Sequence, residues 1–290
     1  MFKGIGIPIF IPFLKDGKVD FKTLENLIFY YSENPAQALI LFPSIEQKNF
    51  LEIEEKVQII DAIVKSNLKN IPLVIQIECT NKNTIDIIEE CTQFSKFDFQ
   101  SFIFNVEFSK SSNSNDIYKF FVSVQDFIKV PFFINTSLIN SKKQLDYNLI
   151  KQMESIRYFY GFIENNNNIS LCIDIKRQFP KLKIYSTDDF TILPFLSIGI
   201  DGVISNIAAI IPNIPYNIYR LFLESKIKEA LKIQLNSNYL NTLLKKSNIS
   251  YRTCMKFLDR DLTVTRFEYE PLDNLTLLWL KKEVYKLLSL

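Results

Sequence analysis

The sequence contains no histidine, and lysine and cysteine are among the side chains left that could do covalent chemistry. The commonest general base near neutral pH is therefore missing, and no Ser-His or Cys-His nucleophile pair can form. Lys110, Lys142 and Lys143 each lie just beyond a predicted strand. A buried amine at such a place, with a lowered pKa, could form an imine with a carbonyl compound.

Four cysteines, Cys79, Cys91, Cys172 and Cys254, are widely spaced and include no CxxC pair. With no histidine to complete a zinc site, this spacing predicts four reduced cysteines in or near the core. We expect neither a metal nor a cofactor.

Polar segments follow three of the predicted strands. In YGFIENNNN, an apolar strand stops at Ile163 and Glu164 and runs directly into four asparagines. Residues 109–116 and 136–143 are similar polar segments after earlier strands. These three segments either line a neutral, hydrogen-bonding pocket or are solvated loop ends.

The element pattern alternates short apolar strands with amphipathic helices such as 19–31, 51–65 and 115–129. Nearly continuous apolarity is typical of strands covered on both faces, as in a parallel sheet. Eight such units predict an α/β fold, a closed (β/α)8 TIM barrel; the alternative is an open Rossmann-like sheet, but no GxGxxG follows the first strand. The predicted strands are 5–11, 38–42, 72–78, 101–105, 131–135, 158–163, 182–186 and 202–205.

The C-terminal part changes to helices alone. A helix at 210–223 would complete the barrel, and helices at 226–244, 249–258 and 272–288 would form a three-helix extension. Because no Gly/Ser-rich linker precedes the extension, we expect it to pack on the barrel. The predicted division is 1–224 for the barrel and 225–290 for the helical extension.

Charge and hydropathy argue against a nucleic-acid or membrane partner. The formal charge of +2 comes from 34 basic and 32 acidic residues, without a run of five like charges. Pro8 and Pro12 interrupt the apolar N-terminal stretch, so it is a poor signal peptide. No window reaches about 18 uninterrupted apolar residues, and we expect a cytoplasmic protein.

Three stretches together resemble one known family. They are PIFIPFLKDGKVDFKTLENLI near the start, YSTDDFTILPFLSIGIDGVISNIAAIIP at 185–212, and the trailing helices. They resemble the dihydrodipicolinate synthase and N-acetylneuraminate lyase family of pyruvate-dependent class I aldolases. The resemblance implies a (β/α)8 barrel with a helical extension, assembled as a dimer or tetramer. It also implies a lysine on the sixth strand that forms a Schiff base with pyruvate.

Alignment with the family's GIKEA-like segment on Gly161 and Glu164 places Ile163 at the lysine position. Isoleucine has no nucleophile, and the nearest lysines, Lys151 and Lys176, do not fit a shifted register.

Other family positions differ as well. The segment that resembles GTTGE reads PSIEQ, with Ser44 and Ile45 at the two hydroxyl positions. The YYN motif aligns with Phe108, Ser109 and Lys110. By the same resemblance, three further family-equivalent positions are Asn135 for the catalytic tyrosine, Asn140 for a carboxylate-binding arginine, and Ile204 in the GVIS segment.

The sequence therefore predicts a barrel of this family that has lost aldolase or lyase activity. Such a protein would act as a non-catalytic subunit or bind a small 2-oxo acid or another small polar molecule. Its partner would be a second copy of itself or an active paralogue. The alternative is an active lyase or synthase on a 2-oxo acid that uses Lys110, Lys142 or Lys143. A third interpretation, a binding module for an unrelated protein, rests only on the basic and aromatic content of the C-terminal helices.

Overall fold

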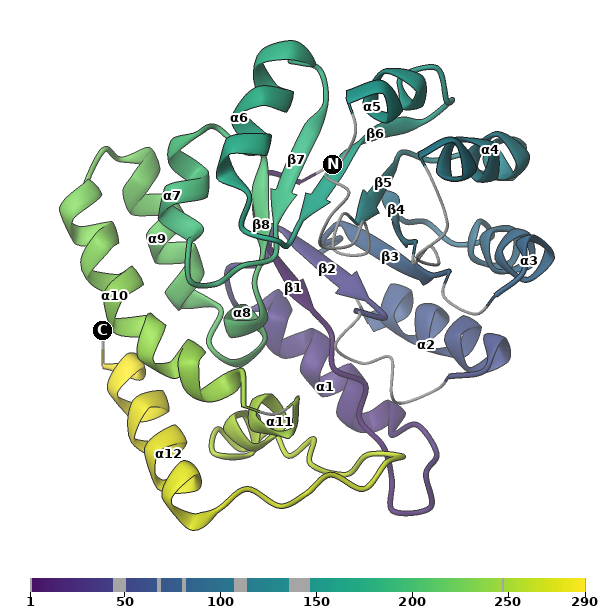
Figure 1. Cartoon of the computed structure of the whole chain (residues 1–290). Helices are drawn as coiled ribbons and strands as arrows, with labels where there is room; N and C mark the ends of the chain where they lie inside the picture. Colours follow the sequence, from purple (N-terminus) through teal and green to yellow (C-terminus); the bar gives the residue numbers. More distant parts are fainter. Residues whose placement is uncertain are drawn as a thin grey trace.

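The strands form a closed barrel in which every neighbouring pair is parallel (Figure 1). This computed structural model describes residues 2–43, 51–66, 69–79, 82–106, 114–135, 147–246 and 248–289. Within them, eight strands follow one another around the barrel in chain order, and β8 closes against β1. The strands are β1 (Gly4–Pro8), β2 (Ala38–Leu41), β3 (Leu73–Glu78), β4 (Ser101–Asn105), β5 (Phe132–Asn135), β6 (Phe159–Glu164), β7 (Lys183–Ser186) and β8 (Gly202–Ile204). The predicted (β/α)8 barrel is confirmed.

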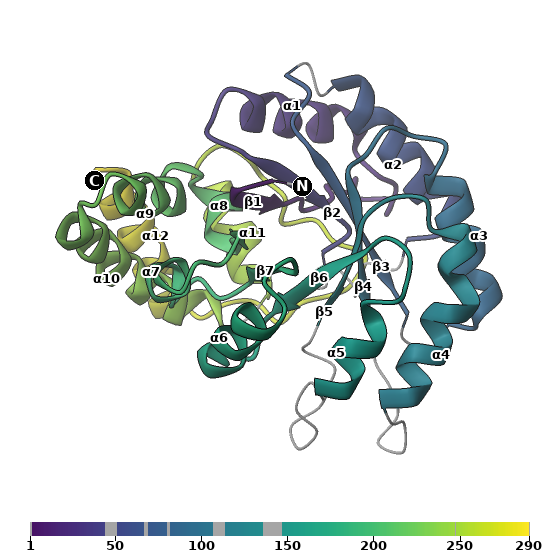
Figure 2. The ribbon, with the colours of Figure 1, turned by 90° about the horizontal axis from the view of Figure 1, so that it is seen from above.

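Helices surround the strands and continue into a C-terminal group, as the view from above shows (Figure 2). In the part of the chain that the structure describes they are α1 (Phe21–Ser32), α2 (Ile53–Ser66), α3 (Thr84–Phe94), α4 (Ser114–Val124), the short 3-10 helix η2 (Gln125–Phe127), α5 (Tyr147–Met153), α6 (Ile169–Gln178), α7 (Ile192–Ser197), α8 (Asn206–Ile210), α9 (Asn213–Leu223), α10 (Ile227–Leu244), α11 (Asn248–Lys256) and α12 (Asn274–Leu288).

Local signals explain several helix starts. The Asp20 carboxylate accepts a hydrogen bond from the backbone N–H of Thr23 (3.0 Å), which caps α1. Asn83 and Asp86 form a reciprocal capping box at the start of α3.

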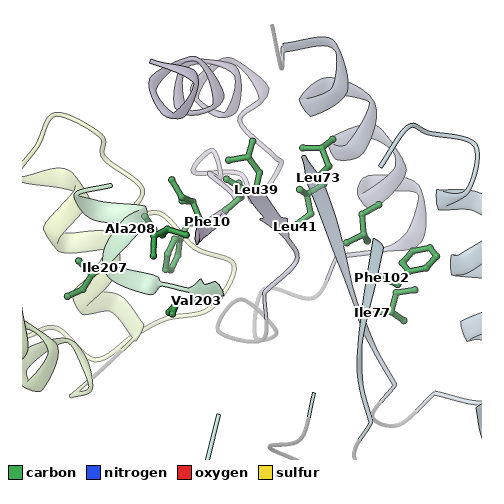
Figure 3. Packing of buried hydrophobic residues seen from close by; sticks show 14 of the residues in the cluster. Phe10, Leu39, Leu41, Leu73, Ile77, Phe102, Val203, Ile207 and Ala208 are labelled. Atoms are coloured by element: carbon green, nitrogen blue, oxygen red, sulfur yellow. The ribbon is translucent and has the colours of Figure 1, made fainter. Parts of the chain in front are cut away.

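Strand side chains separate into two hydrophobic clusters because successive residues point to opposite faces. The larger cluster lies between the strands and the helices, where Figure 3 shows Leu39, Leu73 and Phe102. The smaller cluster fills the barrel interior. It includes Phe2, which precedes β1. The interior cluster consists of Phe2, Ala38, Ile40, Val74, Ile103, Phe133, Ile163, Tyr185 and Ile204.

The first strand and the region before α9 differ from the sequence prediction. The first strand was predicted at 5–11 but ends at Pro8, whose ring nitrogen has no N–H to donate to a strand ladder. The helix predicted at 210–223 corresponds to α9, which begins at Asn213 after Pro212, and the short helix α8 before it was not predicted. Proline favours the start of a helix over its interior, so the chain breaks there and begins again.

The C-terminal helices are tied to the barrel by buried polar side chains. Arg252 of α11 is 1% exposed and donates hydrogen bonds to the carbonyl oxygens of Ile11 (3.2 Å) and Leu262 (2.7 Å). Gln234 of α10 donates to the carbonyl oxygen of Asp189 (2.9 Å). These contacts agree with an extension that packs on the barrel. The division at residue 224 stays a prediction.

All four cysteine side chains are buried, as predicted. Burial raises the pKa of the Cys254 thiol to about 12, which makes it a poor nucleophile. Among the described residues, no helix is both long and apolar enough to cross a membrane.

Candidate functional site

The C-terminal ends of β3 to β7 place five side chains in one inward-facing layer. Strand register pairs Glu78 with Asn105, Asn105 with Asn135, Asn135 with Ile163, and Ile163 with Tyr185. Residues two positions earlier on β4 and β5, Ile103 and Phe133, belong to the interior cluster, and alternation directs the layer into the same space. In barrels of this kind, the strands' C-terminal ends are where catalytic sites form.

A directional chain of hydrogen bonds crosses the polar half of this layer. Asn135 Nδ2 donates to Asn105 Oδ1 (2.7 Å), and Asn105 Nδ2 donates to Glu78 Oε2 (3.2 Å). An ionised carboxylate can only accept, so Glu78 fixes the orientation of Asn105, which in turn fixes that of Asn135. Both asparagines are buried, with 1% and 4% of their surfaces exposed, while Glu78 is partly exposed.

Ile163 forms the apolar continuation of the layer and is 1% exposed. It belongs to the interior cluster together with Phe133, Tyr185 and Ile204. The Tyr185 hydroxyl is also buried and donates to the carbonyl oxygen of Phe2 (2.7 Å). Burial raises the pKa of Tyr185 well above its usual value, so it does not exchange a proton readily near neutral pH. The surroundings of Ile163 are therefore a closed, mainly apolar contact surface.

The four asparagines after β6 mostly build the turn that leads into α6. Glu164 accepts hydrogen bonds from the backbone N–H groups of Asn166 and Asn168. Asn167 adopts a left-handed backbone (φ 58°), which asparagine tolerates well. The Asn168 side chain caps α6 by accepting from the N–H of Leu171 (3.0 Å). For these residues the structure favours turn formation over a role in a pocket.

Asn165 differs from the other three. It directly follows β6 at the C-terminal end of the barrel, and its Oδ1 atom is buried without a hydrogen-bond donor in the described structure. A buried polar atom without a partner is uncommon in folded proteins and calls for water or a ligand.

Asp189 connects the β7 end, α8 and α10. Its carboxylate accepts hydrogen bonds from the Ser205 hydroxyl and from the backbone N–H groups of Asn206 (2.9 Å) and Ile207 (3.2 Å). Its carbonyl oxygen accepts from Gln234 (2.9 Å). Burial raises the pKa of Asp189 to about 7, although these three donors favour the charged form. Through these hydrogen bonds Asp189 links the end of β7 to α8 and α10.

A second buried charged cluster lies outside the strand barrel, between α2 and α3. The Glu90 carboxylate contacts Lys56 Nζ (2.6 Å) and Lys82 Nζ (2.7 Å), and its side chain is 6% exposed. Burial lowers the pKa of Lys56, while the charge of Glu90 opposes that shift. One carboxylate, that of Glu90, therefore pairs with both amines, among the helices outside the strand barrel.

Three predicted site residues, Asn135, Ile163 and Ile204, lie together inside the barrel. The remaining predicted positions, Ser44, Ile45, Phe108, Ser109, Asn140, Lys110, Lys142 and Lys143, lie outside the described residues.

Sequence reasoning missed Glu78 and Asn105, whereas Asn165 lies in a segment that was already a candidate pocket lining. The signal was a polar residue at every second position of an otherwise apolar strand, as with Gln76 and Glu78 in LVIQIE. The described residues include no group of three acidic, cysteine or histidine side chains that could hold a metal ion.

Comparison with known proteins places this site in context. Residues 1–286 match the sequence profile of the dihydrodipicolinate synthetase family. The 4-hydroxy-tetrahydrodipicolinate synthase of Clostridium tetani is 28% identical over 98% of this chain and 97% of its own length. The synthase of the same name from Brachyspira hyodysenteriae is 26% identical over 81% of this chain and 80% of its own.

Solved structures with the same fold include N-acetylneuraminate lyase from Fusobacterium nucleatum, with a TM-score of 0.89, 18% identity and 99% of both chains covered. The 4-hydroxy-tetrahydrodipicolinate synthase of Methylacidiphilum fumariolicum also gives 0.89, at 19% identity, and covers 100% of this chain and 97% of its own. At these identities the structural likeness speaks for the fold alone. Since the profile match extends over nearly all 290 residues, the chain belongs to the dihydrodipicolinate synthetase family.

Proposed function

We propose that this protein is a family member without Schiff-base aldolase or lyase activity, and that it binds a small polar molecule at the C-terminal mouth of its barrel. Its relatives carry the name of 4-hydroxy-tetrahydrodipicolinate synthase. An active synthase of that kind is therefore the natural rival.

The observation that carries the proposal is the environment of Ile163. By family resemblance this is the position of the imine-forming lysine, and here it holds a 1% exposed aliphatic side chain within the interior cluster. An aliphatic side chain cannot attack a ketone. At the described strand ends, no other inward-facing position of the layer carries an amine, since its members are Glu78, Asn105, Asn135 and Tyr185.

The polar half of the layer supports a ligand-binding role. The chain from Asn135 to Glu78 is held in one orientation, which reduces the entropy lost when a ligand binds. Asn165 Oδ1 adds a buried acceptor that a ligand hydroxyl or amine would satisfy. A small polar molecule, a 2-oxo acid among the candidates, is the ligand class that we propose.

Pyruvate trapping tests the proposal directly. The protein is incubated with pyruvate and borohydride, which reduces and fixes any imine, and its intact mass is then measured. We expect no adduct, while a lysine-bearing relative treated in parallel gains one. An adduct on the folded protein refutes the proposal.

Peptide mapping of such an adduct would separate the alternatives. A label on Lys110, Lys142 or Lys143 would establish the active lyase or synthase with a relocated nucleophile. A label on Lys56 would instead identify the amine between α2 and α3, which the structure shows paired with Glu90.

A role as a non-catalytic subunit is the second candidate, and α10 favours it. One face of this helix is buried through residues such as Leu240 and Leu244. The opposite side exposes an apolar stripe at four-residue spacing, in which side chains are 44–61% exposed: Ile227, Leu231, Leu235 and Tyr239. Contiguous apolar surface of this kind commonly marks a protein interface. The proposed partner is a second copy, in a dimer or tetramer, or an active paralogue, in the cytoplasm.

Sedimentation analysis of two variants tests the subunit role. We expect Leu231→Asp with Leu235→Asp to lower the mass of the assembly, because two charges would be buried at the interface. Lys232→Asp, on the same helix but outside the stripe, is the control. An unchanged mass for the double variant would contradict an interface at this stripe.

A further inference from the structure

A groove at the opposite end of the barrel from the mouth has no role in the proposed function. It has a volume of about 530 Å3, within the range of about 300–1,000 Å3 that small-molecule sites occupy. The start of β1, the segment between α1 and β2, and the segment before β3 form its walls, and α9 adds one tyrosine. The lining residues used below are Phe2, Lys3, Asn34, Gln37, Lys69 and Tyr216.

Internal hydrogen bonds determine which polar atoms this groove can offer. Gln37 Oε1 accepts from the backbone N–H of Ile5 (2.8 Å), which leaves the amide NH2 for a ligand. Asn34 Nδ2 donates to the carbonyl oxygen of Tyr30 (2.8 Å), so its carbonyl oxygen remains. With the amines of Lys3 and Lys69 and the hydroxyl of Tyr216, the available groups are mostly donors.

The charge of the groove is positive. Lys69 pairs with Glu33 (2.9 Å), but both side chains are more than half exposed, and such a pair is weak. Lys3 has no ion pair with a carboxylate in the described part of the chain. An anion placed between the lysines would meet two cations and one carboxylate.

The floor of the groove is apolar. Phe2 is 5% exposed, and its ring lies 4.8 Å from the ring of Tyr185 inside the barrel. Its carbonyl oxygen accepts the Tyr185 hydroxyl (2.7 Å). Pro35 and Pro72 add further apolar surface from two rigid residues. A flat apolar group is thus suited to the floor, and an acidic group to the rim.

We propose that this groove binds a small organic anion, in which a carboxylate or phosphate contacts Lys3, Lys69 and the Gln37 amide while an apolar part rests on Phe2. The site is independent of the barrel mouth and goes beyond the proposed function. Because Phe2 holds the Tyr185 hydroxyl, an occupied groove would also change the environment of one interior side chain.

Four probes test the site on the full chain by protein NMR. Phenyl phosphate and phenylacetate carry both required parts, and benzyl alcohol carries only the apolar part. We expect both anions to shift the amide signals of Gln37 and Asn70 and the ring signals of Tyr185, and benzyl alcohol to bind at least about tenfold more weakly. Inorganic phosphate, which lacks the apolar part, should also bind more weakly.

Matched charge variants decide between a built site and general attraction of anions. Lys3→Gln with Lys69→Gln should weaken phenyl phosphate binding by about tenfold. Lys22→Gln with Lys232→Gln removes the same charge from exposed positions on α1 and α10 and should have no effect. Equal weakening in both double variants, or anion-induced shifts that avoid Gln37 and Tyr185, would overturn the proposal. A stronger response to one of the two anions would identify the preferred acidic group.

Discussion

Replacing Ile163 with lysine tests whether the layer inside the barrel is as closed as its contacts indicate. Full burial lowers a lysine pKa by about 3 to 5 units from about 10.4. Each unit corresponds to about 1.4 kcal/mol, so at pH 7.5 the variant should lose about 4 kcal/mol of unfolding free energy. That is a large part of the roughly 5–15 kcal/mol typical of whole proteins.

The loss of unfolding free energy in Ile163→Lys should become smaller as the pH rises. The lysine pKa is lower in the folded state, so between the two pKa values the unfolded state binds more protons and stability rises with pH. The deficit should therefore be full below the folded pKa and shrink by about 1.4 kcal/mol per unit toward about pH 10. Ile163→Met keeps the volume without the charge and should cost less than about 1.5 kcal/mol at every pH.

Urea unfolding of both variants between about pH 6 and pH 9 measures this difference. Pyruvate trapping near pH 9, where the amine is neutral and the destabilisation smallest, then asks whether residue 163 alone suffices for imine formation. An Ile163→Lys variant with the stability of Ile163→Met at every pH would refute the reasoning. It would mean that the side chain reaches water through the mouth.

Three further changes probe the framework. Gly161→Ala should cost more than about 4 kcal/mol of unfolding free energy or prevent folding, because the new Cβ would lie 1.8 Å from a β7 carbonyl oxygen. Gly17→Ala, where the new Cβ meets open space, should cost about 1–2 kcal/mol. Circular dichroism during heating compares the two variants. Asp189→Asn should remove a stability term that is present below about pH 4 and is lost as pH rises through 7, which urea titrations at several pH values detect; an unchanged pH profile would contradict the raised pKa. Arg252→Met should cost about 2–4 kcal/mol in urea unfolding because buried carbonyl oxygens lose their donors, whereas exposed Arg177→Met should change stability by less than about 0.5 kcal/mol; equal losses would contradict the anchoring role.

The barrel could be predicted from sequence because its strands are short, apolar and separated by helical periodicity. The prediction missed α8 and began the next helix at 210, although Pro212 marks the break between α8 and α9. Ile163 could be placed at the family's lysine position because the resemblance supplied the alignment. Glu78 and Asn105 are different: their importance depends on a hydrogen bond between adjacent strands, and a single strand's sequence does not specify the side chain beside it.

The segments that resemble the family contain residues that stabilise the fold. Asp189, in the STDDF stretch, joins the end of β7 to Ser205 of the GVIS stretch and to the N-terminus of α8, and its carbonyl oxygen binds α10. A change at any of these positions would leave buried donors or acceptors without partners, which costs about 1–3 kcal/mol each. The Ile163 side chain has no polar atom, so an aliphatic residue at this position leaves no hydrogen-bonding group of its own side chain without a partner. It packs within the apolar interior cluster. A barrel of this family can therefore keep its recognisable sequence while its catalytic position is replaced, which is the situation we propose here.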